Sequence, residues 1–256
     1  MLNPCRKTRR DFTESGKYSI METQMEIPVI FENDDIYVIN KPSGLAVQGG
    51  SGVSTSVDTL LAEQRGAKVY LVHRLDKDTA GLLITAKNPA AAAVWTKLIG
   101  SHSVSKRYCA LCTGMFASQK GRIADPVVHK GNAKEAETFF RVRRQADIEE
   151  GGMRLCFSLV DLTLGTGRMH QIRIHLAGQK TPIAGDDKYG DFKLNRFLRK
   201  TFGIKKLHLA ATRLDFSEQC VNEADVPPYL EAPFPGFMSE TLARLGFGTV
   251  FTHVKI

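Results

Sequence analysis

The sequence predicts an α+β protein, with a mixed, mostly antiparallel sheet flanked by helices and loops. Two observations support this fold class. Segments with strand-like alternation dominate and often come in adjacent pairs, and segments with helical spacing fall between them at irregular intervals. The 256 residues are enough for one large domain with a core of its own. No internal repeat is visible, which excludes a solenoid or propeller.

The first half of the chain alternates between short strands and helices. A turn at Asn33-Asp34-Asp35 joins two short apolar segments, which predicts a hairpin. Helical spacing of Val57, Leu60 and Leu61 predicts a helix, and an alanine-rich helix ends at Gly100. The predicted elements, in order, are strands in VIFEND and DIYVINKP, a helix in SVDTLLAEQRG, a strand in GLLITAKN, a helix in AAAAVWTKLIG and a strand in SKRYCALCTG.

The second half begins with a hairpin predicted from EAETFFRVRRQ and MRLCFSLVDLTLGT. The spacing of Met169, Ile172 and Leu176 then predicts a helix with these three side chains on one stripe. A basic stretch follows, and LHLAATRLDF is typical of a strand. A proline-rich segment leads to a last helix near MSETLARLG.

The five cysteines indicate reduced thiols in a cytoplasm, because their number is odd and the chain is too long for a small disulfide scaffold. Cys109 and Cys112 form a C-x-x-C within a predicted strand. Residues three apart on a strand point to opposite faces, so we expect neither a shared metal nor a redox pair there. The glycines of QGGSG match no nucleotide-binding fingerprint. We therefore predict no metal site.

The charge balance favours a polyanionic partner, and nucleic acid is the common one. Lys and Arg number 35 against 27 Asp and Glu, a net charge of +8, although many soluble proteins are mildly basic for no special reason. Residues 1–26 lack periodicity and contain four close cations, Arg6, Lys7, Arg9 and Arg10, which predicts a flexible basic arm. The sequence holds no apolar run long enough to span a membrane and no secretory signal.

Two polar clusters are candidates for a functional site. The first surrounds Asp76 with His73, Arg74 and Lys77, where a strand gives way to a loop, and nearby cations would keep such a carboxylate ionised. The second brings His170 and Arg173 together at i, i+3 on a helix, which suits a phosphate or carboxylate. A surface salt-bridge cluster and solvated helix charges are the competing interpretations.

An aromatic residue flanked by cations is a third candidate. Tyr108 follows Lys106 and Arg107 on a predicted strand. Such a tyrosine can stack on an extruded base while the cations hold phosphates. A tyrosine buried in the core is the competing interpretation.

Together these segments resemble the RluA-type family of pseudouridine synthases. The resemblance covers about residues 27–240. Five motifs in series carry the resemblance, and the second of them is the family's catalytic signature. They are Asn40-Lys41-Pro42-Ser43-Gly44-Leu45-Ala46-Val47, His73-Arg74-Leu75-Asp76-x-x-Thr79-x-Gly81-Leu82-Leu83, Ser105-Lys106-Arg107-Tyr108-x-Ala110, Gly167-Arg168-x-His170-Gln171-Ile172-Arg173-x-His175 with Gly185-Asp186-x-x-Tyr189-Gly190, and Leu207-His208-x-Ala210 with Ala232-Pro233-x-Pro235. Ala80 replaces a usual Ser and Met169 a usual Thr, and neither change removes a charged group.

The resemblance implies a pseudouridine synthase catalytic domain over residues 27–256, with an active-site cleft across the sheet. Residues 1–26 are too few for the S4-type domain that many family members carry. The resemblance further implies isomerisation of uridine to pseudouridine in RNA, with no cofactor. Large-subunit 23S ribosomal RNA is the expected substrate, because Gly49-Gly50-Ser51-Gly52 resembles that branch. We expect a cytoplasmic monomer.

The site residues also follow from the resemblance. Asp76 is the expected nucleophile or base, with attack at C1′, attack at C6 and abstraction of the 2′ proton left open. Arg173 is expected to pair with Asp76, and Tyr108 to stack on the base and pass the C5 proton. Leu75 and Ile174 are expected to wall the pocket. The remaining substrate-binding positions implied are His73, Arg74, Thr79, Lys106, Arg168, His170 and Gln171.

Three alternatives stay open. A transfer-RNA pseudouridine synthase of the same family would differ only in substrate. A non-catalytic RNA-binding or ribosome-assembly factor would use the cations and not Asp76. A glycoside hydrolase would need two carboxylates across the scissile bond, such as Asp76 with Asp78 or Asp186 with Asp187.

Overall fold

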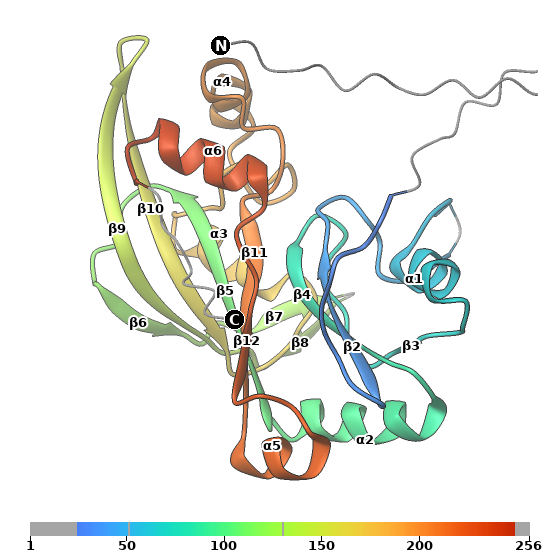
Figure 1. Ribbon diagram of the computed structural model, residues 1–256. Coiled ribbons are helices and arrows are strands. Elements are labelled where there is room, and N and C mark those ends of the chain that lie inside the picture. Colours follow the sequence, from blue (N-terminus) through green and yellow to red (C-terminus); the bar gives the residue numbers. More distant parts are fainter. Residues whose placement is uncertain (1–24, 51, 130, 249–256) are drawn as a thin grey trace, which may run out of the picture.

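The computed structural model describes residues 25–50, 52–129 and 131–248, and the four cations of the predicted N-terminal arm lie outside these residues. Most of the strands form one large sheet, as Figure 1 shows. The strands are β1 (Val29–Glu32), β2 (Ile36–Lys41), β3 (Tyr70–Leu71), β4 (Ala80–Ala86), β5 (Val104–Thr113), β6 (Lys120–Ile123), β7 (Val127–His129), β8 (Asn132–Lys134), β9 (Thr138–Glu150), β10 (Met153–Leu164), β11 (Leu209–Phe216) and β12 (Tyr229–Glu231).

The sheet runs in the order β1-β2-β4-β11-β5-β10-β9-β6, with β3 paired to β4 and β12 to β11. Every pairing in it is antiparallel except that of β4 with β11. The predicted mixed, mostly antiparallel sheet is therefore confirmed. Strands β7 and β8 form a separate hairpin.

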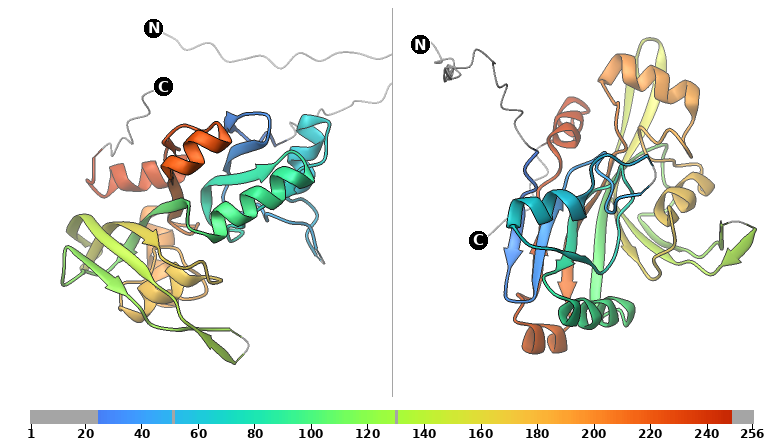
Figure 2. Two further views of the ribbon diagram at one scale, coloured as in Figure 1. Left: turned by 90° about the horizontal axis from the view of Figure 1, so that it is seen from below. Right: turned by 90° about the vertical axis from the view of Figure 1, so that its right-hand side faces the viewer.

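Six helices pack on the two faces of the sheet within the described part of the chain. They are α1 (Val57–Arg65), α2 (Pro89–Gly100), α3 (Gln171–Gly178), α4 (Phe192–Phe202), α5 (Glu218–Ala224) and α6 (Gly236–Arg244). Helices α1 and α3 contribute to the apolar cluster on one face. Helices α4 and α6 pack on the other face, and α2 with α5 on that same face near one end of the strands (Figures 1 and 2).

The alternation predicted for the strands decides which residues enter which cluster. Cys109 packs in the cluster beneath α4 and α6, whereas Cys112 packs in the cluster beneath α1 and α3. The expectation that the two thiols point to opposite faces is therefore confirmed. Burial raises the pKa of Cys109 to about 12, so this thiol stays protonated.

Several elements were not predicted, and one prediction was wrong. The short strands β6, β7, β8 and β12 and helix α5 have too few residues for a clear period. The basic stretch after Tyr189 forms α4. Met169 does not share the stripe of Ile172 and Leu176, because α3 begins at Gln171 and Met169 stays 41% exposed in the preceding loop.

Gly81 permits the parallel contact at the centre of the sheet. Its φ is +107°, and a Cβ at this position would lie 2.1 Å from the backbone oxygen of Ala211. Only glycine tolerates both conditions. The loop that precedes β4 is thereby brought next to β11 and β5, and this loop carries Asp76.

Candidate active site

Asp76 lies in the loop between β3 and β4, which hydrogen bonds hold from two sides. The turn closes on itself, since the Thr79 amide donates to the Asp76 carbonyl at 3.1 Å. From the segment after β2, the Gly44 amide donates to the Lys77 carbonyl at 2.9 Å and Ser43 Oγ to the Asp78 carbonyl at 2.8 Å. The carboxylate therefore extends from a loop whose backbone is anchored.

Lys41 is the central anchor of this loop. Its side chain is fully buried, and Nζ donates to the carbonyls of Pro42 (3.0 Å), Leu45 (2.8 Å) and Lys77 (2.9 Å). Burial lowers the pKa of Lys41 to about 8, and the charges of Asp78 and Asp76 oppose that fall. A buried ammonium with three carbonyl partners fixes the two segments relative to each other.

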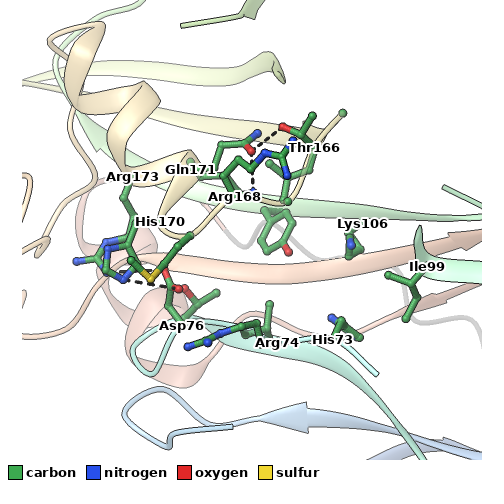
Figure 3. A pocket seen from close by; sticks show the side chains of 18 of the residues that line it. His73, Arg74, Asp76, Ile99, Lys106, Thr166, Arg168, His170, Gln171 and Arg173 are labelled. Carbon is green, nitrogen blue, oxygen red and sulfur yellow. Dashed lines mark hydrogen bonds and ion pairs between the residues drawn. The ribbon is translucent and has the colours of Figure 1, made fainter. Parts of the chain in front are cut away.

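Two side chains from the α3 region face Asp76. Arg173 NH1 lies 3.7 Å from one carboxylate oxygen and His170 Nε2 lies 3.8 Å from the other. Figure 3 shows Asp76, His170 and Arg173 together at one end of the cavity, with Lys106 and His73 toward the other. The Asp76 side chain is only 18% exposed, so this charge is partly withdrawn from water.

Arg173 has a closer partner than Asp76. Its Nε and NH2 donate to the two oxygens of Asp186 at 2.8 and 2.7 Å, and both residues are buried. Burial alone would raise the pKa of Asp186, but hydrogen bonds from Arg173 and from the amides of Tyr189 and Lys188 lower it below its ordinary value. The expected pairing of Arg173 with Asp76 is thus present at a longer distance, while Asp186 holds the guanidinium in place.

His170 enters the site through an unusual backbone conformation. Its φ of +55° and ψ of 19° place it in the left-handed region immediately before α3. Its Nδ1 forms a 2.9 Å hydrogen bond with the Tyr189 hydroxyl. Desolvation lowers the pKa of His170, and the charge of Asp76 opposes this effect. The ring is therefore mostly neutral at neutral pH.

Gln171 stabilises the bend that leads into α3. Its Oε1 accepts from the Thr166 hydroxyl at 2.7 Å and from the Arg168 amide at 3.0 Å. Its Nε2 donates to the Glu137 carbonyl at 2.8 Å and to Thr138 Oγ1 at 3.0 Å. These contacts engage both polar atoms of the Gln171 side-chain amide. Gln171 therefore shapes the cavity wall indirectly, by holding the backbone of the bend in place.

A cavity of about 710 Å³ opens on the sheet face above β5 and next to Asp76. The expected active-site cleft across the sheet is found here. The predicted site residues that line it are His73, Arg74, Leu75, Asp76, Thr79, Lys106, Tyr108, Arg168, His170, Gln171 and Arg173. Ile172 lines the cavity in place of the expected Ile174. Each residue of a helix is rotated by about 100° from the one before it, so Ile174, two residues after Ile172, points to a different side of α3.

The surroundings of the cavity shift the pKa values of its titratable groups in different directions. Burial raises the pKa of Tyr108, and the negative charge of Asp76 raises it further. Burial lowers the pKa of Lys106. Burial and the charge of Lys106 lower the pKa of His73 to about 3, and its Nε2 accepts a hydrogen bond from the Ile84 amide at 3.0 Å. His73 is therefore a neutral wall residue.

Asp76 also borders a second cavity, of about 500 Å³, on its other side. The two cavities share Asp76, His170 and Arg173. Four lysines line the second cavity, namely Lys77, Lys188, Lys205 and Lys206. A strand of phosphates that passes Asp76 would meet cations on both sides.

From the sequence, no role was assigned to Lys41 or Tyr189, and Asp186 was considered only as a partner of Asp187 in the hydrolase alternative. All three lie in the motifs that carry the resemblance, and this position was the sequence feature that could have indicated them. Their partners are distant in sequence, so their functions followed only from the fold. Within the described residues, no group of three or more His, Cys, Asp or Glu side chains has an arrangement suited to a metal ion, and no helix has the length and apolar character to cross a bilayer.

Comparison with known proteins shows the family to which this chain belongs. Residues 35–178, which include Asp76, Tyr108 and Arg173, match the family described as RNA pseudouridylate synthase. The chain belongs to this family of isomerases. It shares 35% identity with the ribosomal large subunit pseudouridine synthase C of Escherichia coli strain K12 over 85% of this chain and 69% of that protein. The protein of that name from Buchnera aphidicola is 33% identical over 73% of this chain and 62% of its own length.

Solved structures show the same fold. The human RNA pseudouridylate synthase domain containing 4 is 26% identical and superposes with a TM-score of 0.68, over 86% of this chain and 93% of that one. The human domain containing 1 protein has a TM-score of 0.62 at 20% identity, over 86% of this chain and 95% of that one. The predicted pseudouridine synthase fold is confirmed.

Proposed function

We propose that this chain isomerises uridine to pseudouridine in large-subunit 23S ribosomal RNA, with Asp76 as its catalytic carboxylate. The observation that carries the proposal is the position of Asp76. Its carboxylate borders the 710 Å³ cavity while Arg173 and His170 lie 3.7 and 3.8 Å from its oxygens. The carboxylate thus lies beside a cation and close to a base held in the cavity.

The reaction breaks the N1–C1′ bond, turns the uracil and joins C5 to C1′. The uracil loses the proton from C5 and gains one at N1, so no redox step occurs and no group leaves the molecule. The enzyme must hold the detached base and exclude water. Leu75 and Ile172 supply apolar wall for this purpose. Asp76 acts at the sugar or at C6 of the base.

Tyr108 has the second role in this proposal. It lies two residues beyond Lys106 on β5, so both side chains face the cavity. Because its pKa is raised, the phenol is protonated before reaction. It therefore cannot act as a resting base. It stacks on the uracil and relays a proton in one concerted step: its oxygen takes the C5 proton while its own phenolic proton passes to water, and N1 takes a proton from water.

The substrate assignment comes from the relatives. Proteins 33–35% identical to this chain are named ribosomal large subunit pseudouridine synthase C, and they are bacterial. The target uridine must leave its stack to reach Asp76. We assign the flanking phosphates to Arg74, Lys106 and Arg168 on one side and to the four lysines of the second cavity on the other. We further propose that the protein works as a monomer in the cytoplasm.

The structure gives no support to the hydrolase alternative. Asp76 is the one carboxylate among the described residues that line the 710 Å³ cavity, whereas glycoside hydrolysis uses two. Both carboxylate oxygens of Asp186 accept hydrogen bonds from Arg173, and the Asp187 side chain is 71% exposed. Neither of the acidic pairs considered from the sequence spans this cavity.

The test is pseudouridine mapping on total RNA from cells that lack the protein. The cells are complemented with wild type, with Asp76→Asn or with Asp34→Asn, a matched change in the exposed β1–β2 turn. We expect specific sites in large-subunit ribosomal RNA to return with wild type and Asp34→Asn only. Full restoration by Asp76→Asn would refute the catalytic assignment. Sites in transfer RNA would refute the substrate, and no altered site would favour a non-catalytic RNA-binding factor.

A further inference from the structure

A second groove, which we call the back groove, lies on the face of the sheet opposite the active site. Its volume is about 720 Å³. Arg107 lines it, whereas Lys106 and Tyr108, its neighbours on β5, line the active-site cavity. Thr163 on β10 lies in the back groove, and Leu164 in the active-site cavity. Strand alternation thus separates two cavities by the thickness of one sheet.

The register of the strands aligns the groove residues in two rows. The first row follows Cα pairing from β6 to β12 and comprises Arg122, Phe139, Thr163, Arg107, Arg213 and Glu231. The second row comprises Lys120, Arg141 and Asp161. Figure 1 shows β6, β9 and β10 side by side at the edge of the molecule. The groove is therefore an ordered sheet surface lined by six cations and two carboxylates.

Four of the six cations in the groove have carboxylate partners. Arg143 donates to both oxygens of Asp161 at 2.7 Å, and Arg213 donates to Glu231 at 2.8 Å. Arg107 pairs with Asp215 at 2.6 Å, and Arg122 pairs with Glu137. These pairs hold most of the surface in a fixed geometry.

Lys120 and Arg141 are different. Both are exposed, and neither side chain has an ion pair or hydrogen bond with any residue that the structure describes. They are Cα partners across the β6–β9 pair, and like charges directly opposite each other weaken a sheet. An anion bound between them would remove this repulsion. Two facing cations on a rigid sheet are thus suited to a phosphate.

An exposed aromatic ring lies beside these cations. Phe139 is 42% exposed although it belongs to a sheet surface, with Arg122 opposite on β6 and Thr163 opposite on β10. A flat apolar ring among cations is the arrangement that binds unpaired nucleotides, because the base stacks and the cations hold the backbone. An acidic protein segment would use the cations but leave the ring without a matching group.

We infer that the back groove binds a single-stranded RNA segment, with Lys120 and Arg141 on a phosphate and Phe139 on a base. The inference rests on the proposed function in taking RNA as the partner. The bound segment is separate from the target uridine, since the two cavities open on opposite faces. The groove would therefore add affinity for a long RNA without entering the chemistry.

The experiment measures affinity of the full chain for a large-subunit ribosomal RNA transcript over a range of salt concentrations. The variants are Lys120→Gln with Arg141→Gln, and Phe139→Ala. The control is Arg196→Gln with Lys200→Gln, two exposed cations on α4 that line neither the back groove nor the active-site cavity. Thermal unfolding of each variant verifies folding, and the first variant should be no less stable than wild type because it removes a repulsion.

We expect the Lys120/Arg141 variant to bind about tenfold more weakly and its salt slope to fall by about two. Phe139→Ala should weaken binding about tenfold with an unchanged slope, since stacking releases no counterions. Equal effects of the groove pair and the α4 pair would overturn the inference, because net charge alone would then explain them. Unchanged affinity in all variants would also overturn it and would favour an acidic protein as the ligand.

The binding readout needs no turnover, so it separates this inference from the proposed function. If wild type modifies no RNA but the groove variants lose affinity as expected, the proposed function fails and the back groove stands. If wild type modifies ribosomal RNA and the groove variants bind normally, only the back groove fails.

Discussion

Arg173 and Asp186 form a buried, two-pronged ion pair, with N–O distances of 2.8 and 2.7 Å, and this pair sets the position of the guanidinium beside Asp76. Gly185 allows Asp186 to reach it, because a Cβ on Gly185 would lie 2.2 Å from the Lys206 carbonyl oxygen. The cation near the proposed catalytic carboxylate is thus held by a second carboxylate, a role that the sequence did not assign to Asp186.

Asp186→Asn should lower kcat about a hundredfold, because Arg173 loses the partner that orients it toward Asp76. The change also leaves a buried cation without a full counter-charge, so we expect the free energy of unfolding to fall by about 3 kcal/mol. Single-turnover kinetics and urea unfolding measure the two effects. Asp187→Asn, at an adjacent residue whose side chain is 71% exposed, is the control and should leave kcat near wild type. A wild-type kcat for Asp186→Asn would contradict the positioning role.

Tyr108→Phe should separate stacking from proton transfer. The ring stays in place, so RNA affinity should change little, whereas loss of the hydroxyl should lower turnover about a hundredfold. Equilibrium binding and single-turnover kinetics on the same transcript measure both. If turnover survives intact, the hydroxyl takes no part in moving the C5 proton. Tyr70→Phe, on β3, serves as the matched control.

Lys41→Met should reduce both activity and stability. The substitution removes the hydrogen bonds to three carbonyls and leaves the Lys77 carbonyl with the Gly44 amide alone. We expect a loss of about 3 kcal/mol in unfolding free energy and a lower kcat, because the Asp76 loop loosens. Lys97→Met on the exposed side of α2 should change neither. Loss of stability without loss of kcat would show that the loop does not depend on this lysine.

Stability should decrease as the pH falls below about 6.5, in part because of His208. Burial lowers the pKa of this histidine to about 4, from 6.5 in the unfolded chain. Above pH 6.5 His208 is neutral in both the folded and the unfolded state, so its contribution to stability is fully present. Between pH 6.5 and 4 only the unfolded state takes up the proton, so stability falls by at most about 1.4 kcal/mol per pH unit for this residue.

Urea unfolding at pH 7.5 and pH 5 measures this dependence. His208→Gln should be less stable at pH 7.5, because His208 bonds the Lys206 carbonyl at 2.8 Å and Thr241 at 2.9 Å. It should also lose less stability between the two pH values than wild type does. His102→Gln, at an exposed position after α2, should behave as wild type. An identical pH dependence in His208→Gln would contradict the assignment.

The sequence by itself determined the properties that depend on local periodicity. Alternation along β5 put Lys106 and Tyr108 on one face and correctly separated Cys109 from Cys112. Turn residues located the β1–β2 hairpin, and the motif order located Asp76 in a loop before a strand. These features need only neighbouring residues, because backbone geometry alternates side chains along a strand wherever that strand lies.

The tertiary structure alone decided which distant groups meet. It placed the Arg173 guanidinium within hydrogen-bonding distance of Asp186 and farther from Asp76. It also brought the Lys41 ammonium into a hydrogen bond with the Lys77 carbonyl. It also began α3 only after Met169, which leaves this residue off the predicted stripe, and it paired Lys120 with Arg141. Each of these contacts joins segments whose separation is set by strand order and loop path, and a sequence pattern carries no measure of distance across the sheet.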